Sequence, residues 1–149
     1  MKLNLKKLLC TDTVFLDLKA ETKEEVIREM IDRLVESGRI KNREAALEAV
    51  LDRERKMATG MEYGIAIPHG KTDGVDQLVT AIARKKKGVD FNSMDGKPST
   101  IFVMTVSPLS RSGPHIQFLA EVSKLLKDSR ARERILEAET AEDIIRVFC

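Results

Sequence analysis

The two histidines of this chain, His69 and His115, are the residues best suited to nucleophilic or proton-transfer chemistry. A neutral imidazole keeps a lone pair on one ring nitrogen and titrates near neutrality. It can therefore shuttle a proton or accept a phosphoryl group without much prior activation. His69 ends a short apolar stretch and lies between Pro68 and Gly70, which should hold its ring at a fixed, accessible edge. The ordinary alternative is a loop histidine with a single hydrogen bond.

His115 and Arg53 are the second and third candidates for a site. His115 follows Gly113 and Pro114 at the start of a predicted helix, where free backbone N–H groups and the helix dipole favour an anion. Arg53 lies in the last turns of a predicted helix, whose end delivers side chains towards the next segment. Each has a structural alternative: His115 could line the first turn of its helix, and Arg53 could form a solvated ion pair.

Amphipathic helices must position these groups. Thr22 followed by Glu25 fits a capping box at the start of one helix, and Gly38 suits its C-terminal end. Thr140 is a candidate cap for the last helix. Apolar side chains recur at helical spacing in five segments, so helices are predicted at residues 23–37, 43–56, 115–126, 131–138 and 141–148.

Strands are predicted where Val, Ile, Thr and Phe concentrate. These segments are residues 14–18, 64–67, 78–84 and 99–106, with turn residues and a short strand or hairpin expected over 88–96. Because helices come before, between and after the strands, the pattern predicts an α/β fold. We expect one three-layer α/β/α domain over residues 1–149, with a mixed β-sheet flanked by helices.

Composition excludes several classes of protein. A chain of 149 residues is about one domain long, and 26 basic against 24 acidic residues leave a net charge of +2, which favours neither nucleic acid nor an anionic membrane. Cys10 and Cys149 form no CxxC pair, so they are interpreted as inert thiols. No apolar run reaches the ~20 residues that span a bilayer. Residues 1–10 are interpreted as part of the fold, and the expected location is the cytoplasm.

A metal site is a rival interpretation of the two histidines. Asp73 and Asp76 follow His69 closely and could complete a ligand set with His69 and His115, although an aspartate in a glycine-rich turn is ordinary. Such a module would carry stoichiometric zinc. We expect a site without metal or cofactor. The lysines at 85–87 could bind an acidic partner, but a solvated strand end is the simpler interpretation.

Four segments together resemble a known signature. They are RERKMATG at 53–60, GIAIPHG at 64–70, DGKP at 95–98 and HIQFLA at 115–120. In this order they resemble the fructose/mannitol-type enzyme IIA domains, which are phosphocarriers of the bacterial phosphoenolpyruvate-dependent sugar phosphotransferase system. The resemblance covers essentially the whole chain.

The resemblance implies a role for each candidate. His69 would accept a phosphoryl group from phospho-HPr and pass it to a IIB domain, with indirect membrane association through a IIC permease. His115 would lie beside His69 and contact the phosphoryl group, and Arg53 would supply positive charge. Nucleophilic attack is expected through Nε2, with Nδ1–H fixed by a backbone carbonyl. Thr59 and nearby glycine amides are plausible minor donors, because transfer depends on alignment and on positive groups.

Two questions stay open at this point. Glu62 and Tyr63 replace a glycine–asparagine pair of many family members, and a carboxylate close to phosphohistidine would disfavour the phosphorylated form. A regulatory protein of the nitrogen-related branch would need the same histidine and would move no sugar. The sugar and the oligomeric state are not predicted.

Overall fold

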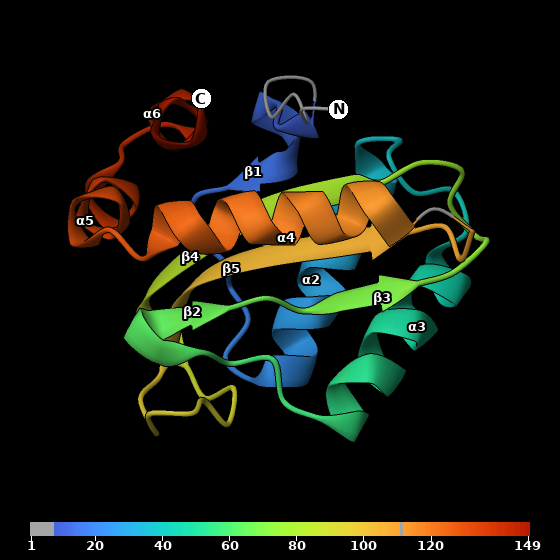
Figure 1. Ribbon diagram of the computed structural model, residues 1–149, viewed down its shortest axis with the longest axis horizontal. Coiled ribbons are helices and arrows are strands. Elements are labelled where there is room, and N and C mark those ends of the chain that lie inside the picture. The colour runs from blue at the N-terminus through green and yellow to red at the C-terminus, as the bar shows by residue number, and fades with distance from the viewer. Residues whose placement is uncertain (1–7, 111) are drawn as a thin grey trace.

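A five-stranded mixed sheet forms the centre of the protein (Figure 1). The computed structural model describes residues 8–110 and 112–149. The strand order is β1-β4-β5-β2, with β3 also pairing with β5; β4 and β5 are antiparallel and the other pairs parallel. The strands are β1 (Val14–Phe15), β2 (Ile65–Ala66), β3 (His69–Lys71), β4 (Val79–Val89) and β5 (Ser99–Ser107).

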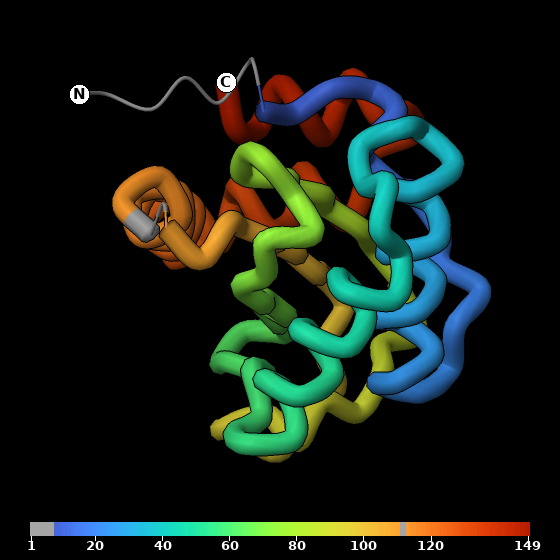
Figure 2. The backbone as a smooth tube through the Cα atoms, turned by 90° about the vertical axis from the view of Figure 1, so that its right-hand side faces the viewer, coloured from blue at the N-terminus to red at the C-terminus, as the bar shows by residue number. Residues whose placement is uncertain are grey.

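Helices cover both faces of the sheet (Figures 1 and 2). One layer packs α2 and α3 against the sheet, and the other packs α4, α5 and α6. The predicted three-layer α/β/α arrangement with a mixed sheet is thus confirmed. The helices are α2 (Lys23–Glu36), α3 (Arg43–Lys56), α4 (Ser112–Leu126), α5 (Ser129–Glu137) and α6 (Ala141–Phe148), with short 3-10 turns η1 (Thr11–Thr13) and η2 (Glu62–Gly64).

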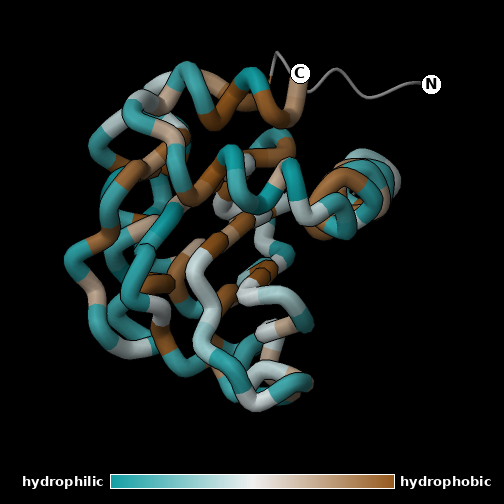
Figure 3. Tube along the Cα trace, turned by 90° about the vertical axis from the view of Figure 1, so that its left-hand side faces the viewer, coloured by the Kyte–Doolittle hydropathy of each residue, from teal (hydrophilic) through white to brown (hydrophobic). Residues whose placement is uncertain are grey.

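The face toward α2 and α3 is apolar along its length. Alternate residues of β4 and β5 point into it and are fully buried, and hydrophobic stretches gather between the layers (Figure 3). Gly70 lies on this face, where a Cβ would stand 2.8 Å from the backbone of Ala49 and Val50. β3 therefore rests directly on α3. The strand residues on this face are Ala66, Ala81, Ala83, Phe102, Met104 and Val106.

The opposite face packs against α4, α5 and α6 through Ile82, Ile101 and Val103. It also contains Arg84, whose side chain is buried and donates hydrogen bonds to the carbonyls of Leu16, Ile135 and Ala138 at 3.0, 3.0 and 2.6 Å. Carbonyl oxygens left over at the end of a helix need donors. One guanidinium thus joins the end of α5 to the strand edge.

Helix ends follow the sequence closely. The Thr22 hydroxyl accepts a hydrogen bond from the Glu25 amide at 3.2 Å, as predicted. The Glu25 carboxylate accepts from that hydroxyl instead of the Thr22 amide, so the expected capping box is incomplete. Gly38 adopts φ +79° just after α2, a conformation that glycine reaches at low cost. Thr140 caps α6 in a full capping box.

The predicted strand at 64–67 is wrong in its extent. β2 covers only Ile65–Ala66, and after Ile67 and Pro68 the chain continues as β3, so His69 lies in a strand and not in a loop. Proline has no amide hydrogen for the ladder, and β5 supplies the pairing on either side of it. Other observed boundaries also differ from the predicted ones. β1 is shorter than predicted, β4 continues through the lysines at 85–87, and α4 begins before His115.

Two further expectations concern the ends of the chain and the membrane. The interpretation of residues 1–10 as part of the fold lies mostly outside the described residues, which begin at residue 8. Within the described residues, no helix is both long enough and apolar enough to cross a bilayer.

Candidate functional site

The structure brings the two histidines together. Their ring centroids are 5.5 Å apart, with the ring planes tilted by 51°. His69 pairs with Thr105 across the β3–β5 ladder, and the Thr105 hydroxyl lies 3.2 Å from Nδ1 of His115. Paired residues of parallel neighbours point to one face of a sheet. His69 and Thr105 therefore both face α4, and α4 places His115 above them.

His69 is held in one ring orientation by its own strand. Its Nδ1 donates a hydrogen bond to the Ile67 carbonyl at 2.8 Å, so in the neutral ring the lone pair lies on Nε2. Burial lowers the pKa of His69, the hydrogen bond to Ile67 opposes this, and the charge of Arg53 lowers the pKa further. The half-buried ring is thus neutral at pH 7, and Nε2 is available as a nucleophile.

His115 is buried, with 4% of its surface exposed. Burial lowers its pKa to about 4, and the positive charges that His69 and Lys71 can carry act in the same direction. The ring is neutral at pH 7. A neutral imidazole that is hydrogen-bonded at Nδ1 can still form a second hydrogen bond through Nε2. His115 can therefore contact a group attached to His69 without a covalent bond to it.

Arg53 lies in the last turn of α3. Its Nη1 donates to the Met57 carbonyl at 2.8 Å. Arg53 and His69 line one open cavity of about 550 Å³, so the predicted association of these residues is observed. The rest of its wall is mostly apolar and consists of Met57, Ala58, Thr59, Gly60, Met61, Ile67, Asn92, Met94, Leu119 and Ser123.

Glu54, which sequence reasoning did not single out, fixes the loop between α3 and β2. Its buried carboxylate accepts from the Thr59 amide at 2.7 Å and from the Thr59 hydroxyl at 2.5 Å, and lies 3.2 Å from Nζ of Lys23. The Thr59 carbonyl in turn accepts from the Ile67 amide at 3.2 Å. Both donors of Thr59 are therefore occupied, which contradicts its expected role as a minor donor to the phosphoryl group.

Lys71 is a second residue of the site that sequence reasoning did not single out. It follows His69 by two positions in β3, is exposed, and is close enough for its charge to lower the pKa of both histidines. The available signal was strand alternation, which puts residues two apart on one face. It could be used only after the segment was known to be a strand.

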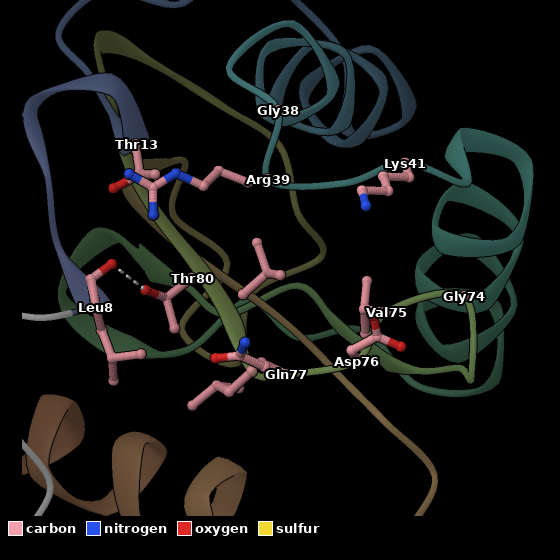
Figure 4. A pocket seen from close by; sticks show the side chains of 12 residues that line it. Leu8, Thr13, Gly38, Arg39, Lys41, Gly74, Val75, Asp76, Gln77 and Thr80 are labelled. Atoms are coloured by element: carbon pink, nitrogen blue, oxygen red, sulfur yellow. Dashed lines mark hydrogen bonds between the residues drawn. The ribbon is translucent and has the colours of Figure 1, made fainter.

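The alternative of a metal site finds no ligand set. Among residues 8–110 and 112–149, no three His, Cys, Asp or Glu side chains are grouped so as to hold a metal ion. Asp73 accepts instead from the Leu109 amide at 3.2 Å and so joins two loops. Asp76 lines a separate cavity of about 350 Å³ with Arg39 and Lys41, which shares no lining residue with the cavity at His69 (Figure 4).

Glu62 and Tyr63 shape the η2 turn. Tyr63 adopts φ 64°, and the guanidinium of Arg132 lies 4.4 Å from the centroid of its ring, a cation–π contact with α5. The carboxylate that acts on the pKa of His69 is Glu54, which raises it, and Glu62 is not among the groups that shift this pKa. Glu62 and Tyr63 thus set the conformation of this turn, and the effect of Glu62 on the phosphorylated form of His69 stays a prediction.

The chain is similar in sequence to a known family. The family model described as "Phosphoenolpyruvate-dependent sugar phosphotransferase system, EIIA 2" matches residues 7–149. The "PTS system fructose-specific EIIA component" of Haloferax volcanii is 38% identical over 133 residues, which cover 89% of this chain and 86% of that protein.

Two solved structures are also similar. The nitrogen regulatory protein IIA-Ntr of Neisseria meningitidis has a TM-score of 0.85 at 26% identity, covering 96% of this chain and 97% of that one. The enzyme IIA-mannitol of Escherichia coli, solved in complex with phosphorylated enzyme IIB-mannitol, has a TM-score of 0.81 at 26% identity, covering 94% and 96%.

Proposed function

This chain belongs to the EIIA 2 family of the phosphoenolpyruvate-dependent sugar phosphotransferase system, and we propose that it carries the phosphoryl group on Nε2 of His69. It is a phosphotransfer component of that system and passes the group to a IIB domain. The observation that carries the assignment to His69 is the pair of hydrogen-bonded rings 5.5 Å apart, with the lone pair of His69 on the unbonded nitrogen.

The reaction is two in-line displacements at phosphorus. Nε2 of His69 attacks the phosphoryl group of phospho-HPr, the bond between phosphorus and the donor group of HPr breaks, and that donor group leaves with the electron pair. A nucleophile of the IIB domain then attacks the same phosphorus, and the bond to Nε2 of His69 breaks. Catalysis consists of alignment and stabilisation of charge on the equatorial oxygens, for which no metal is required.

Neighbouring groups provide that stabilisation. His115 contributes Nε2, which carries the ring hydrogen when the Thr105 hydroxyl donates to Nδ1, and Arg53 contributes a guanidinium whose Nη1 is held by the Met57 carbonyl. The Ile67 carbonyl keeps His69 in the reactive tautomer and stabilises the ring as it gains positive character. The working location is the cytoplasm, where IIB would act with a membrane IIC permease.

A phosphorylation assay tests this function. Incubation with phosphoenolpyruvate, enzyme I and HPr should give an acid-labile, base-stable phosphoprotein. His69→Ala should abolish the label, whereas His115→Ala should still be labelled and should pass the group on more slowly. If His69→Ala is labelled as well as the parent, the assignment of the phosphorylation site is wrong.

A regulatory role is the second candidate, favoured by the likeness to the nitrogen regulatory protein of N. meningitidis. In that case the phosphorylation state of His69 would control binding to a partner, with no sugar moved. The two roles differ in the acceptor. Transfer from phospho-His69 to purified IIB domains supports transport, whereas a phosphoprotein that is stable with every IIB tested but changes its affinity for a regulatory partner supports regulation.

A further inference from the structure

Lys71 occupies the same face of β3 as His69. Between them, Gly70 faces α3, where the backbone of Ala49 and Val50 leaves no room for a Cβ. Since side chains alternate along a strand, His69 and Lys71 must both project toward the α4 side, with Cα atoms about 6–7 Å apart. This orientation follows from packing and does not depend on the lysine rotamer.

The surroundings of Lys71 supply little to neutralise it. Its side chain is exposed, and no ion pair within residues 8–110 and 112–149 includes it. Across the ladder it pairs with Ser107, whose buried hydroxyl has no hydrogen-bond partner. On the face that holds His69 and Thr105, the neighbouring pair therefore consists of the unpaired ammonium of Lys71 and the unsatisfied hydroxyl of Ser107.

Lys71 and Arg53 differ in which histidine their charges reach. Lys71 lowers the pKa of His69 and also that of His115, whereas Arg53 acts on His69. Lys71 thus lies on the α4 side of the sheet together with both rings, whereas Arg53 approaches His69 from the end of α3, through the cavity that these two residues line. A group attached to Nε2 of His69 would have one cation from β3 and one from α3 in its surroundings.

We propose that the ammonium of Lys71 contacts the phosphoryl group while His69 carries it, as a further catalytic residue of this phosphocarrier. The inference rests on the proposed function of His69. A phosphoryl group carries nearly two negative charges at pH 7, and a hydrogen bond between two charged groups is about twice as strong as a neutral one. Arg53 is fixed by Met57, whereas the flexible lysine stem can follow the group during transfer.

The test uses a charge-neutralising variant, a charge-keeping variant and a remote control. Lys71→Gln removes the ammonium, and Lys71→Arg keeps the charge. Lys87→Gln is the control, because it removes an exposed lysine from β4. Lys87 lies seven residues along the strand from Thr80, which pairs with Thr105 beside His69, so it is on the order of 20 Å from His69. All three variants should fold, since both lysines are exposed.

Two measurements are made on each protein. The first is the equilibrium constant for phosphorylation by phospho-HPr, which we expect Lys71→Gln to lower about tenfold and Lys71→Arg to restore largely. The second is a ³¹P NMR titration after chemical phosphorylation with phosphoramidate, which transfers its phosphoryl group to imidazole and releases ammonia. Loss of a contacting ammonium should raise the second pKa of the phosphoryl group in Lys71→Gln, while Lys87→Gln should match the parent.

The outcomes separate the two proposals. If Lys71→Gln matches Lys87→Gln in both measurements, the contact is wrong and the function of His69 stands. If the parent is labelled by phosphoramidate and not by phospho-HPr, the proposed function fails while the ³¹P titration still decides the contact. A parent that neither donor labels overturns both.

Discussion

The two faces of the sheet differ in composition and in function. The face toward α2 and α3 is a continuous apolar layer, whereas the face toward α4 changes character along its length. At one end it presents Thr80, Thr105 and His69 side by side across three strands, with His115 above them. The chemistry is thus placed where one face of a strand turns polar while the other face of the same strand stays packed.

The three residues of β3 show this contrast between a packed face and a polar face. Gly70 is buried against α3, and its neighbours His69 and Lys71 point to the opposite side. A nucleophile must be held close to its productive geometry, and a backbone packed on a helix holds it better than a free loop. The apolar face therefore contributes to function by fixing the strand, and the polar face contributes the reacting groups.

The largest expected effect concerns the apolar face. Phe102→Ala removes a fully buried ring that lies 5.3 Å from the ring of Phe91, and it should lower the free energy of unfolding by about 3–5 kcal/mol. Urea denaturation measures this. Phe102→Leu is the matched control and should cost clearly less. A loss below about 1 kcal/mol for Phe102→Ala would mean that this face of the sheet is not closely packed against α2 and α3.

The next effect belongs to the polar face and depends on pH. Burial holds the pKa of His115 at about 4, against 6.5 for the ordinary side chain, so on acidification the unfolded chain takes up this proton first. The contribution of His115 to the free energy of unfolding is therefore fully present above pH 6.5. It decreases by about 3 kcal/mol as the pH falls toward 4.

His115→Asn provides the control for that pH dependence, because it cannot titrate and keeps a polar group near Thr105. The difference in unfolding free energy between pH 7 and pH 4 should be smaller in the variant than in the parent, measured by urea denaturation at each pH. Equal pH dependence in the two proteins would show that His115 is not buried in its neutral form.

The contrast between the faces also explains what the sequence could predict. The helix at 23–37 was located to within one residue, because an apolar stripe, Thr22 and Gly38 all indicate the same boundaries. β3 was missed because a three-residue strand containing Gly70 cannot show alternation, and its pairing partner is 36 residues away in β5. Long-range pairing therefore decided the structure where local pattern was weakest.

The site shows the same limit. The two histidines and Arg53 were predicted to meet because their segments resemble a family signature, and the structure brings all three to one end of the sheet. Local sequence could not reveal Lys71, whose relevance depends on the strand, or Glu54, whose carboxylate matters because it is buried against Thr59 and Lys23. Both depend on tertiary contacts.

The third prediction joins the two faces. Gly70→Ala places a methyl group 2.8 Å from the backbone of α3, so the strand must shift, at an expected cost of about 1–3 kcal/mol. Because His69 is the preceding residue, phosphorylation should slow even in the folded fraction. Gly113→Ala is the control, since a Cβ there has open space. Unchanged phosphorylation with reduced stability would show that the packed face does not set the position of the nucleophile.

The smallest effect sharpens the comparison within the polar face, between the two cations near His69, Lys71 from β3 and Arg53 from α3. Removing a positive charge raises the pKa of a nearby histidine, because the protonated ring is no longer repelled. Lys71→Gln should raise the pKa of both His69 and His115, whereas Arg53→Gln should raise mainly that of His69. NMR titration resolves this cleanly, since the chain has only two histidines. If Arg53→Gln raises the pKa of both rings equally, the charge of Arg53 reaches His115 as strongly as His69, and the distinction drawn between the two cations fails.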